Sequence, residues 1–324
     1  MDSRIRKVVP GDATRIAELC ESERRRYSAG YANYYAPAAD YAEKKRLAVL
    51  GLIADDASIA LVHESNGELD GVFLGRMVAA PPVYDPGGKV CLFDEFVVDG
   101  DAAWSRAGSA LIDAVDGRIR DLGGVLLIIE CMHAAAAKRD LLSSIGFTIA
   151  SDWLCRDIDL SEPKHACAGV IERATADDLP AMLNLAAERR LLHESFQPVF
   201  WRVAADANEK QAPYLSWRVG HENSIVLVHR TDTGVDGFIV ADPFATQPLF
   251  DRAGTSCNVD DFTVAGDSLW PVGEWLLYRA TVEAKSRGAV NTQVICANAD
   301  TLKFDTLAHI GYEVGHHWYV RSVE

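Results

Sequence analysis

The sequence predicts a mixed α/β fold that is built twice in tandem. The second half of the chain repeats the first at an almost constant offset of 166 residues, because residues 58–63 return as 224–229 (224 − 58 = 166) and residues 94–104 return as 260–270. Each copy also alternates short strands with amphipathic helices. The period far exceeds the roughly 20 to 50 residues of a solenoid repeat, so each copy is expected to be a domain with its own core.

The two domains are expected to span residues 1–162 and 167–324. A polar, Pro-containing stretch at residues 161–165 follows a predicted strand and precedes the second copy of the opening pattern. From Cys131 onward the offset is 165 (296 − 131 = 165), which indicates one residue lost, just after a helix.

Each copy is predicted to open with a short strand and a helix. Asp12 and Asp177-Asp178 are N-cap candidates for these helices. A variable helical region and a strand pair broken by a turn come next. The predicted ranges are 5–8, 59–63 and 71–75 in the first copy, and 171–174, 225–229 and 237–241 in the second.

A longer strand follows, at residues 90–98 and 256–264, and leads through a Gly-Asp turn into an amphipathic helix. The next strand, at 125–131 and 290–296, is apolar and is expected to be buried. A short helix ending in Ile-Gly-Phe or Ile-Gly-Tyr then leads to a last strand, which contains Trp153 or Trp318.

Composition excludes several classes of protein. The hydrophobic fraction of 49% is that of a globular chain, and no apolar run is long enough to span a bilayer. A net charge of −15 argues against a nucleic-acid surface. Seven cysteines without a Cys-x-x-Cys pair, and an N-terminus without an apolar signal, favour reduced thiols and a cytoplasmic location. The histidines have no partners at metal-ligand spacing, so no metal is expected.

Three segments of the first half carry a family resemblance: 96–98 leading into 106–111, then 127–129, then 145–147. With the order of the elements, they resemble the GNAT (GCN5-related N-acetyltransferase) superfamily, in both halves and so over nearly the whole chain. The resemblance implies two tandem GNAT-like domains. It also implies acetyl-CoA as co-substrate and a small amine as acceptor.

In that superfamily a loop of the pattern Gln/Arg-x-x-Gly-x-Gly/Ala holds the pyrophosphate of acetyl-CoA, and free amides at a helix start form such an anion site. The corresponding places hold Ala103, Arg106 and Gly108 in the first half. In the second half they hold Leu269, Val272 and Glu274, and a glutamate there repels phosphate. The N-terminal half is therefore favoured as the cofactor site. Its expected cofactor-binding residues are Val97, Val98, Arg106, Ala107, Gly108 and Ser109.

Adjacent acids on the fourth strand are the catalytic candidates. Glu95 is the first choice as general base or ammonium-binding carboxylate, and Asp94 is the second. Because successive strand residues face opposite ways, at most one of the pair is expected to face a given cleft. The alternative is that these acids hold loop amides or cap a neighbouring element. The tyrosine that many family members use as general acid is replaced by Leu142 and Leu307.

Two functions remain open. One is an acyl-CoA-dependent N-acetyltransferase with one working half, and the other is a degenerate tandem protein that binds a ligand or partner without acyl transfer. The expected partner is a small-molecule amine, with neither nucleic acid nor membrane. The acceptor, the acyl chain length and the oligomeric state stay open, a homodimer being one option.

Overall fold

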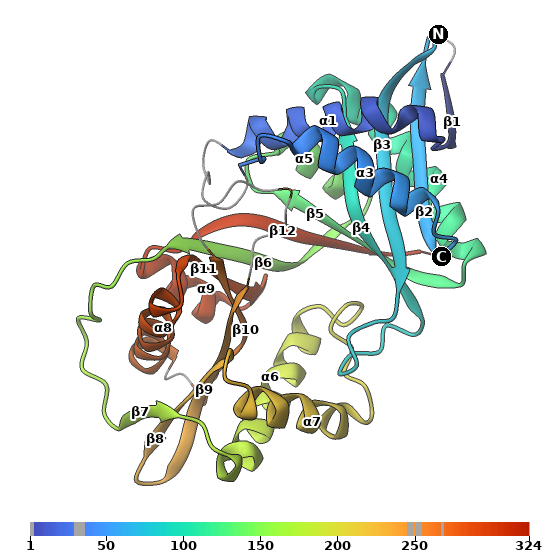
Figure 1. Cartoon of the computed structure of the whole chain (residues 1–324). Coiled ribbons are helices and arrows are strands. Elements are labelled where there is room, and N and C mark those ends of the chain that lie inside the picture. Colours follow the sequence, from blue (N-terminus) through green and yellow to red (C-terminus); the bar gives the residue numbers. More distant parts are fainter. Residues whose placement is uncertain (1–2, 29–35, 245–248, 250–254, 267–268, 324) are drawn as a thin grey trace.

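The computed structural model describes residues 3–28, 36–244, 249, 255–266 and 269–323 (Figure 1). The first half contains β1 (Ser3–Lys7), α1 (Ala13–Tyr27), α3 (Tyr41–Ile53), β2 (Ser58–Ser65), β3 (Glu68–Val78), β4 (Lys89–Val98), α4 (Ser109–Asp121), β5 (Gly124–Met132), α5 (Ala136–Ser144) and β6 (Thr148–Asp157). The second half contains β7 (Val170–Arg173), α6 (Leu179–Phe196), α7 (Ala207–Gly220), β8 (Ile225–Thr231), β9 (Gly234–Phe244), β10 (Thr255–Val264), α8 (Leu269–Ser286), β11 (Ala289–Ala297), α9 (Thr301–His309) and β12 (Glu313–Ser322).

All twelve of these strands form one mixed sheet, in the order β1-β2-β3-β4-β5-β12-β6-β11-β10-β9-β8-β7. The pairs β4–β5 and β10–β11 are parallel, and the remaining neighbours are antiparallel. A helix joins the two strands of each parallel pair, α4 in the first half and α8 in the second. The predicted mixed α/β class is confirmed.

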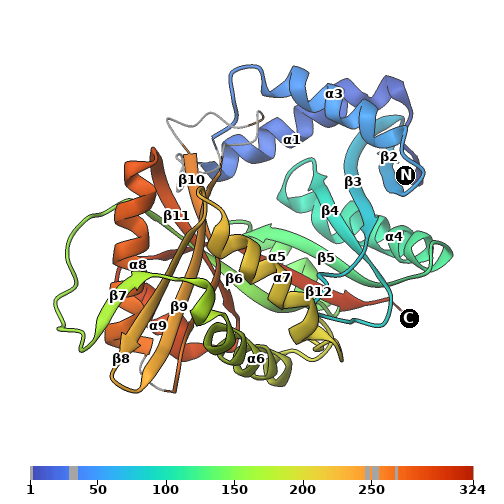
Figure 2. The same cartoon turned by 60° about the horizontal axis from the view of Figure 1, so that its bottom comes forward.

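The halves exchange their last strands at the centre of this sheet. β12 pairs with β5 of the first half, β6 pairs with β11 of the second, and the two exchanged strands pair with each other. The exchange is visible as the red β12 and the green β6 crossing between the halves (Figures 1 and 2). Its register is symmetric, because Cys131 faces His317 and the matching Cys296 faces Asp152. The sheet therefore joins the two copies instead of ending at a boundary between them.

Helices cover both faces of the sheet in each half. In the first half, α1 and α3 pack over side chains such as Val62 and Val97, while α4 and α5 cover the opposite face with Phe73 and Phe96. α6 and α7, and α8 and α9, repeat this division in the second half. Tyr319 of β12 enters the first-half core and Leu154 of β6 enters the second. Each core therefore depends on a strand from the other copy.

Asp12 and Asp178 occupy the N-cap positions of α1 and α6, but neither side chain makes an N-cap hydrogen bond to its helix. The Asp12 carboxylate accepts a hydrogen bond from the Val9 amide at 2.8 Å, and Asp178 accepts one from Thr175 at the same distance. Both close a short 3-10 turn that leads into α1 or α6. No helix among the described residues is long and apolar enough to cross a bilayer.

Candidate functional sites

The fourth strand of each half separates from the fifth partway along its length. β4 pairs with β5 from Lys89–Gly124 to Leu92–Ile128, yet it continues to Val98. β10 behaves in the same way, since its pairing with β11 ends at Val259–Val294 and the strand runs on to Val264. Each half therefore opens its sheet at the parallel pair, which leaves a wedge between two strands.

A β-bulge places the paired acids at each opening. The register of β3 against β4 shifts so that Leu74 faces Glu95 and Gly75 faces Phe93, which leaves Asp94 as the extra residue. Asp260 is the extra residue in the second half. Both acids of a pair line one cavity, Asp94 and Glu95 in the first half. The expectation that at most one could face a cleft was wrong, because the bulge interrupts the alternation on which it depended.

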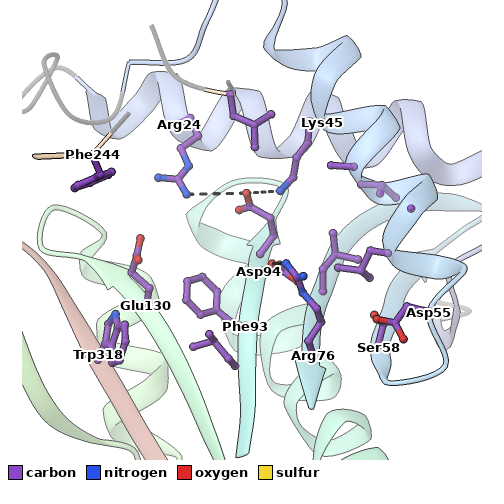
Figure 3. A pocket seen from close by; sticks show the side chains of 18 residues that line it. Arg24, Lys45, Asp55, Ser58, Arg76, Phe93, Asp94, Glu130, Phe244 and Trp318 are labelled. Atoms are coloured by element: carbon purple, nitrogen blue, oxygen red, sulfur yellow. Dashed lines mark hydrogen bonds and ion pairs between the residues drawn. The ribbon is translucent and has the colours of Figure 1, made fainter. Parts of the chain in front are cut away.

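The N-terminal cleft is a cavity of about 730 Å³ beside β4 (Figure 3). Lys45 Nζ lies 2.7 Å from Glu95 Oε1, and Arg24 Nη2 lies 4.0 Å from the same oxygen. Burial alone would raise the pKa of Glu95, but the charges of Lys45 and Arg24 lower it. Glu95 is therefore an ion-paired carboxylate in the free protein.

The second acid of this cleft is also paired. Arg76 donates two hydrogen bonds to the Asp94 carboxylate, at 2.7 and 3.0 Å. Phe244, which belongs to the second half, lines the same cavity, as does Trp318 of the exchanged strand. The cleft is therefore built from both copies of the repeat.

The predicted cofactor loop forms a compact turn between β4 and α4. A 3-10 turn at Asp101–Ala103 and a π-helical turn at Trp104–Gly108 precede Ser109, the first residue of α4. A Cβ on Gly108 would lie 2.7 Å from Leu141 and 2.9 Å from Trp104, so this glycine allows close packing inside the protein.

The other predicted cofactor residues take different positions. Arg106 is 47% exposed and pairs with Asp70 at 2.7 Å. Ala107 is buried, and Val97 and Val98 lie in the cores on opposite faces of the sheet. Arg106 and the start of α4 at Ser109 are thus the parts of the set open to a cofactor, and these assignments remain predictions.

The C-terminal cleft is a cavity of about 440 Å³ at the matching place beside β10. Gln211 Nε2 donates to the Asp261 carboxylate at 3.1 Å, where the first half has the Lys45–Glu95 ion pair. Burial and the neighbouring Asp260 raise the pKa of Asp261 to about 6. Tyr214 donates to Asp260, and Arg218 lies 3.9 Å from it. Asp261 is therefore poised to change its charge near neutral pH.

Besides Lys45, two further buried lysines were not predicted as site residues. Lys138 of α5 lies over the rings of Phe96 and Trp104, with Nζ 5.5 and 5.6 Å from their centroids. Lys303 of α9 lies 5.1 Å from the Phe262 ring, and burial together with Arg189 lowers its pKa to about 8. The sequence did carry a signal, since a lysine recurs at an offset of 165 (303 − 138 = 165) on otherwise apolar helix faces.

A further set of polar side chains comes from the exchanged strands and from the turns that follow β5 and β11. His133 Nδ1 lies 3.0 Å from His317 Nε2, and His317 Nδ1 lies 2.6 Å from Asp152. Asn298 donates to Asp152 at 3.0 Å, so a polar chain joins the two halves, with His317 and Asp152 buried and His133 and Asn298 exposed at its ends. In the described part of the chain, no group of three or more His, Cys, Asp or Glu side chains is arranged to hold a metal.

This architecture is the tandem GNAT fold. A tandem GNAT protein from the clavulanic acid biosynthesis pathway matches 100% of this chain and 99% of its own at 12% identity, with a TM-score of 0.53. A GCN5-related N-acetyltransferase from Sphaerobacter thermophilus matches 99% of this chain and 96% of its own at 14% identity, with a TM-score of 0.58. A glucosamine N-acetyltransferase region of a fungal β-N-acetylglucosaminidase matches 99% of this chain and 38% of its own at 12% identity, with a TM-score of 0.57.

No protein-family model matches the sequence, and no curated protein does. The chain is thus similar to GNAT acetyltransferases in fold, with both halves present over the full length.

Proposed function

We propose that the chain is an acyl-CoA-dependent N-acyltransferase that moves an acetyl group from acetyl-CoA to a small amine, with the N-terminal half as its cofactor site. The observation that carries the proposal is the wedge between β4 and β5 with two carboxylates at its mouth. Such a wedge exposes backbone amides of β4 beyond Leu92, and these suit the oxyanion of acyl transfer.

Within this proposal Glu95 accepts the proton of the acceptor ammonium or holds it for attack. The ion pair with Lys45 weakens a carboxylate as a base, so acceptor binding must draw Lys45 away from Glu95. Lys138 lies on α5 one turn before Leu142, where the family tyrosine is missing. In this proposal its buried ammonium would stabilise and protonate the CoA thiolate.

A second candidate is a tandem protein that binds ligands without acyl transfer. The observation that favours it is the satisfied ion pair on Glu95, together with Leu142 at the place of the expected acid. The two candidates differ in turnover with any amine when acetyl-CoA is bound.

Calorimetric titration with acetyl-CoA tests the cofactor site. A negative charge at the helix start, introduced by Arg106→Glu or Ser109→Glu, is expected to weaken binding about tenfold or more because it repels the pyrophosphate. Arg118→Glu is the matched control for Arg106→Glu, since it makes the same charge change at the far end of α4 and should leave binding unchanged. Gly108 is unsuitable for this test, because any side chain there meets Leu141 and Trp104.

The results of these titrations and of an amine screen distinguish the two candidate functions. Absence of acetyl-CoA binding to the wild-type protein would overturn the proposal. Binding without transfer across an amine panel would favour the binding protein. Equal losses in Arg106→Glu and Arg118→Glu would remove the N-terminal loop as the phosphate site.

A further inference from the structure

The C-terminal cleft contains a buried arginine that lacks an acidic partner. Arg190 is 4% exposed and donates to the side-chain oxygen of Asn208, while its Nε and Nη1 atoms have no hydrogen-bond partner among the described residues. The matching Arg24 lies 4.0 Å from Glu95 (24 + 166 = 190). A buried guanidinium is costly without a counter-ion, so the arrangement around Arg190 is incomplete until an anion enters.

Three substitutions between the copies produce this difference. Glu95 is replaced by Asp261, whose side chain is one methylene shorter, and Lys45 is replaced by Gln211. Glu23 is replaced by Arg189, a cation that forms an ion pair with Asp300. The N-terminal cleft pairs Glu95 with Lys45 and Arg24, whereas in the C-terminal cleft Asp261 and Arg190 do not form an ion pair with each other.

Further unpartnered polar atoms line the same cavity. Both ring nitrogens of His193 lack a partner among the described residues, as do the indole N–H groups of Trp153 and Trp318. Burial lowers the pKa of His193 well below its usual value, so its ring is neutral. Buried polar groups are nearly always satisfied in folded proteins, and several orphans around one cavity indicate a polar ligand.

The walls of the cavity are aromatic. Seven rings line it, those of Tyr84, Trp153, Phe200, Trp201, Tyr214, Phe262 and Trp318. Tyr84 comes from the first half, whose β3–β4 loop is tied to the second half by the hydrogen bond from Ala204 N to Val83 O at 3.0 Å. The volume of about 440 Å³ falls in the range of small-molecule sites.

We propose that the C-terminal cleft binds a free α-amino acid with an aromatic or large apolar side chain. The carboxylate pairs with Arg190 and accepts a hydrogen bond from His193, the ammonium pairs with Asp261, and the side chain packs among the rings. The charges of Lys303, Arg190 and Arg189 act on Asp261, so the two ends of the site lie within electrostatic reach of each other. An amine alone would leave Arg190 without an acidic partner, and an acid alone would leave Asp261 without an ion pair.

Calorimetry on the full chain without acetyl-CoA tests this proposal separately from acyl transfer. The panel is phenylalanine, tyrosine, tryptophan, leucine and methionine, with glycine as the ligand that lacks a side chain. Saturable binding of at least one large apolar amino acid is expected, and glycine should bind at least about tenfold more weakly. For the best ligand, the decarboxylated amine and the deaminated acid should each also lose at least about tenfold.

Variants then test which residue binds the carboxylate of the amino acid and which binds its ammonium. Arg190→Gln should abolish the preference for the amino acid over its decarboxylated amine, and Asp261→Asn should abolish the preference over its deaminated acid. The matched variants of the first cleft, Arg24→Gln and Glu95→Gln, should leave the affinity of this site unchanged. Arg190→Lys, which keeps the charge and loses the planar fork, should bind with intermediate affinity.

Three results would overturn the proposal: no amino acid of the panel binds, the single-group analogues bind as tightly as the amino acid, or the first-cleft variants lose binding instead. The comparison of ligands on the wild-type protein decides the matter even where a variant fails to fold.

Discussion

In the N-terminal cleft Glu95 is held by Lys45 and Arg24, whereas at the matching place of the C-terminal cleft Asp261 faces the uncharged amide of Gln211. The backbone is the same in both, since each acid lies next to a β-bulge on a strand that separates from its neighbour. The pKa of Glu95 is lowered and that of Asp261 is raised. The two clefts thus differ in a few side chains that are carried by the same strand arrangement.

The comparison also reverses the simplest interpretation of the repeat. The phosphate-loop pattern favours the N-terminal half, because Glu274 occupies the loop of the second copy. The buried arginine without an acidic partner, Arg190, however, lies in the C-terminal cleft. Under the two proposals the N-terminal half would bind the cofactor and the C-terminal cleft would bind a small zwitterion.

The largest effect is expected from breaking the internal ion pair. Lys45→Met leaves the buried Glu95 with the more distant Arg24 as its remaining ion-pair partner, and should lower the free energy of unfolding by about 3 kcal/mol. Gln211→Met at the matching place removes one hydrogen bond and should cost about 1 kcal/mol. Urea denaturation at pH 7 measures both. Equal losses would mean that the two clefts are electrostatically alike.

The second prediction concerns the sign of the effect when each acid is neutralised. The groups that act on Asp261 are Asp260, Lys303, Arg190 and Arg189. Its folded pKa of about 6 lies above its ordinary value of 3.8, so the folded state holds the proton more tightly and ionisation opposes folding as pH rises from about 4 to 6. Asp261→Asn should therefore raise the free energy of unfolding at pH 7 by about 1 to 2 kcal/mol, and the gain should vanish near pH 4.

Glu95→Gln is the matching variant of the first cleft, and its effect on the free energy of unfolding at pH 7 is expected to have the opposite sign to that of Asp261→Asn. Glu95 is surrounded by Lys45, Arg24, Lys138 and Glu23. Its lowered pKa means that the carboxylate stabilises the fold above its ordinary pKa of 4.5, and that this contribution is lost as pH falls further. Glu95→Gln should therefore destabilise the protein at pH 7. Denaturation curves at pH 4 and pH 7 on both variants check the pair, and effects of the same sign at pH 7 would contradict it.

Much of the fold was predictable because the repeat fixes it twice. The strands, the helix starts at Asp12 and Asp178, and the mixed sheet follow from local patterns that recur in each copy. The exchange of β6 and β12 could not be predicted. Either partner gives β5 an equivalent neighbour, so the same apolar residues are buried whether the strand comes from its own copy or from the other.

The candidate site was predictable only in part. The acids Asp94 and Glu95 stood out in the sequence, but their shared orientation depends on a bulge that has no local signature here. The partners of Glu95 come from two helices, and Lys45 lies 50 positions from it in the sequence (95 − 45 = 50). Contacts across such a distance are set by packing of α3 over the sheet, which periodicity alone cannot specify.

The smallest expected effect tests whether each cleft depends on the other half. The Tyr84 ring lies 5.0 Å from that of Trp201 in an edge-on contact, and it covers the C-terminal cavity from the first half. Tyr84→Ala should weaken binding of the amino acid about five- to tenfold, since one aromatic wall is lost. Phe244→Ala, which removes a ring from the wall of the N-terminal cleft, should leave that affinity unchanged. Calorimetry on the two variants measures the difference in affinity. An equal loss in both would mean that the two side chains act on overall stability instead of on the cavity that each lines.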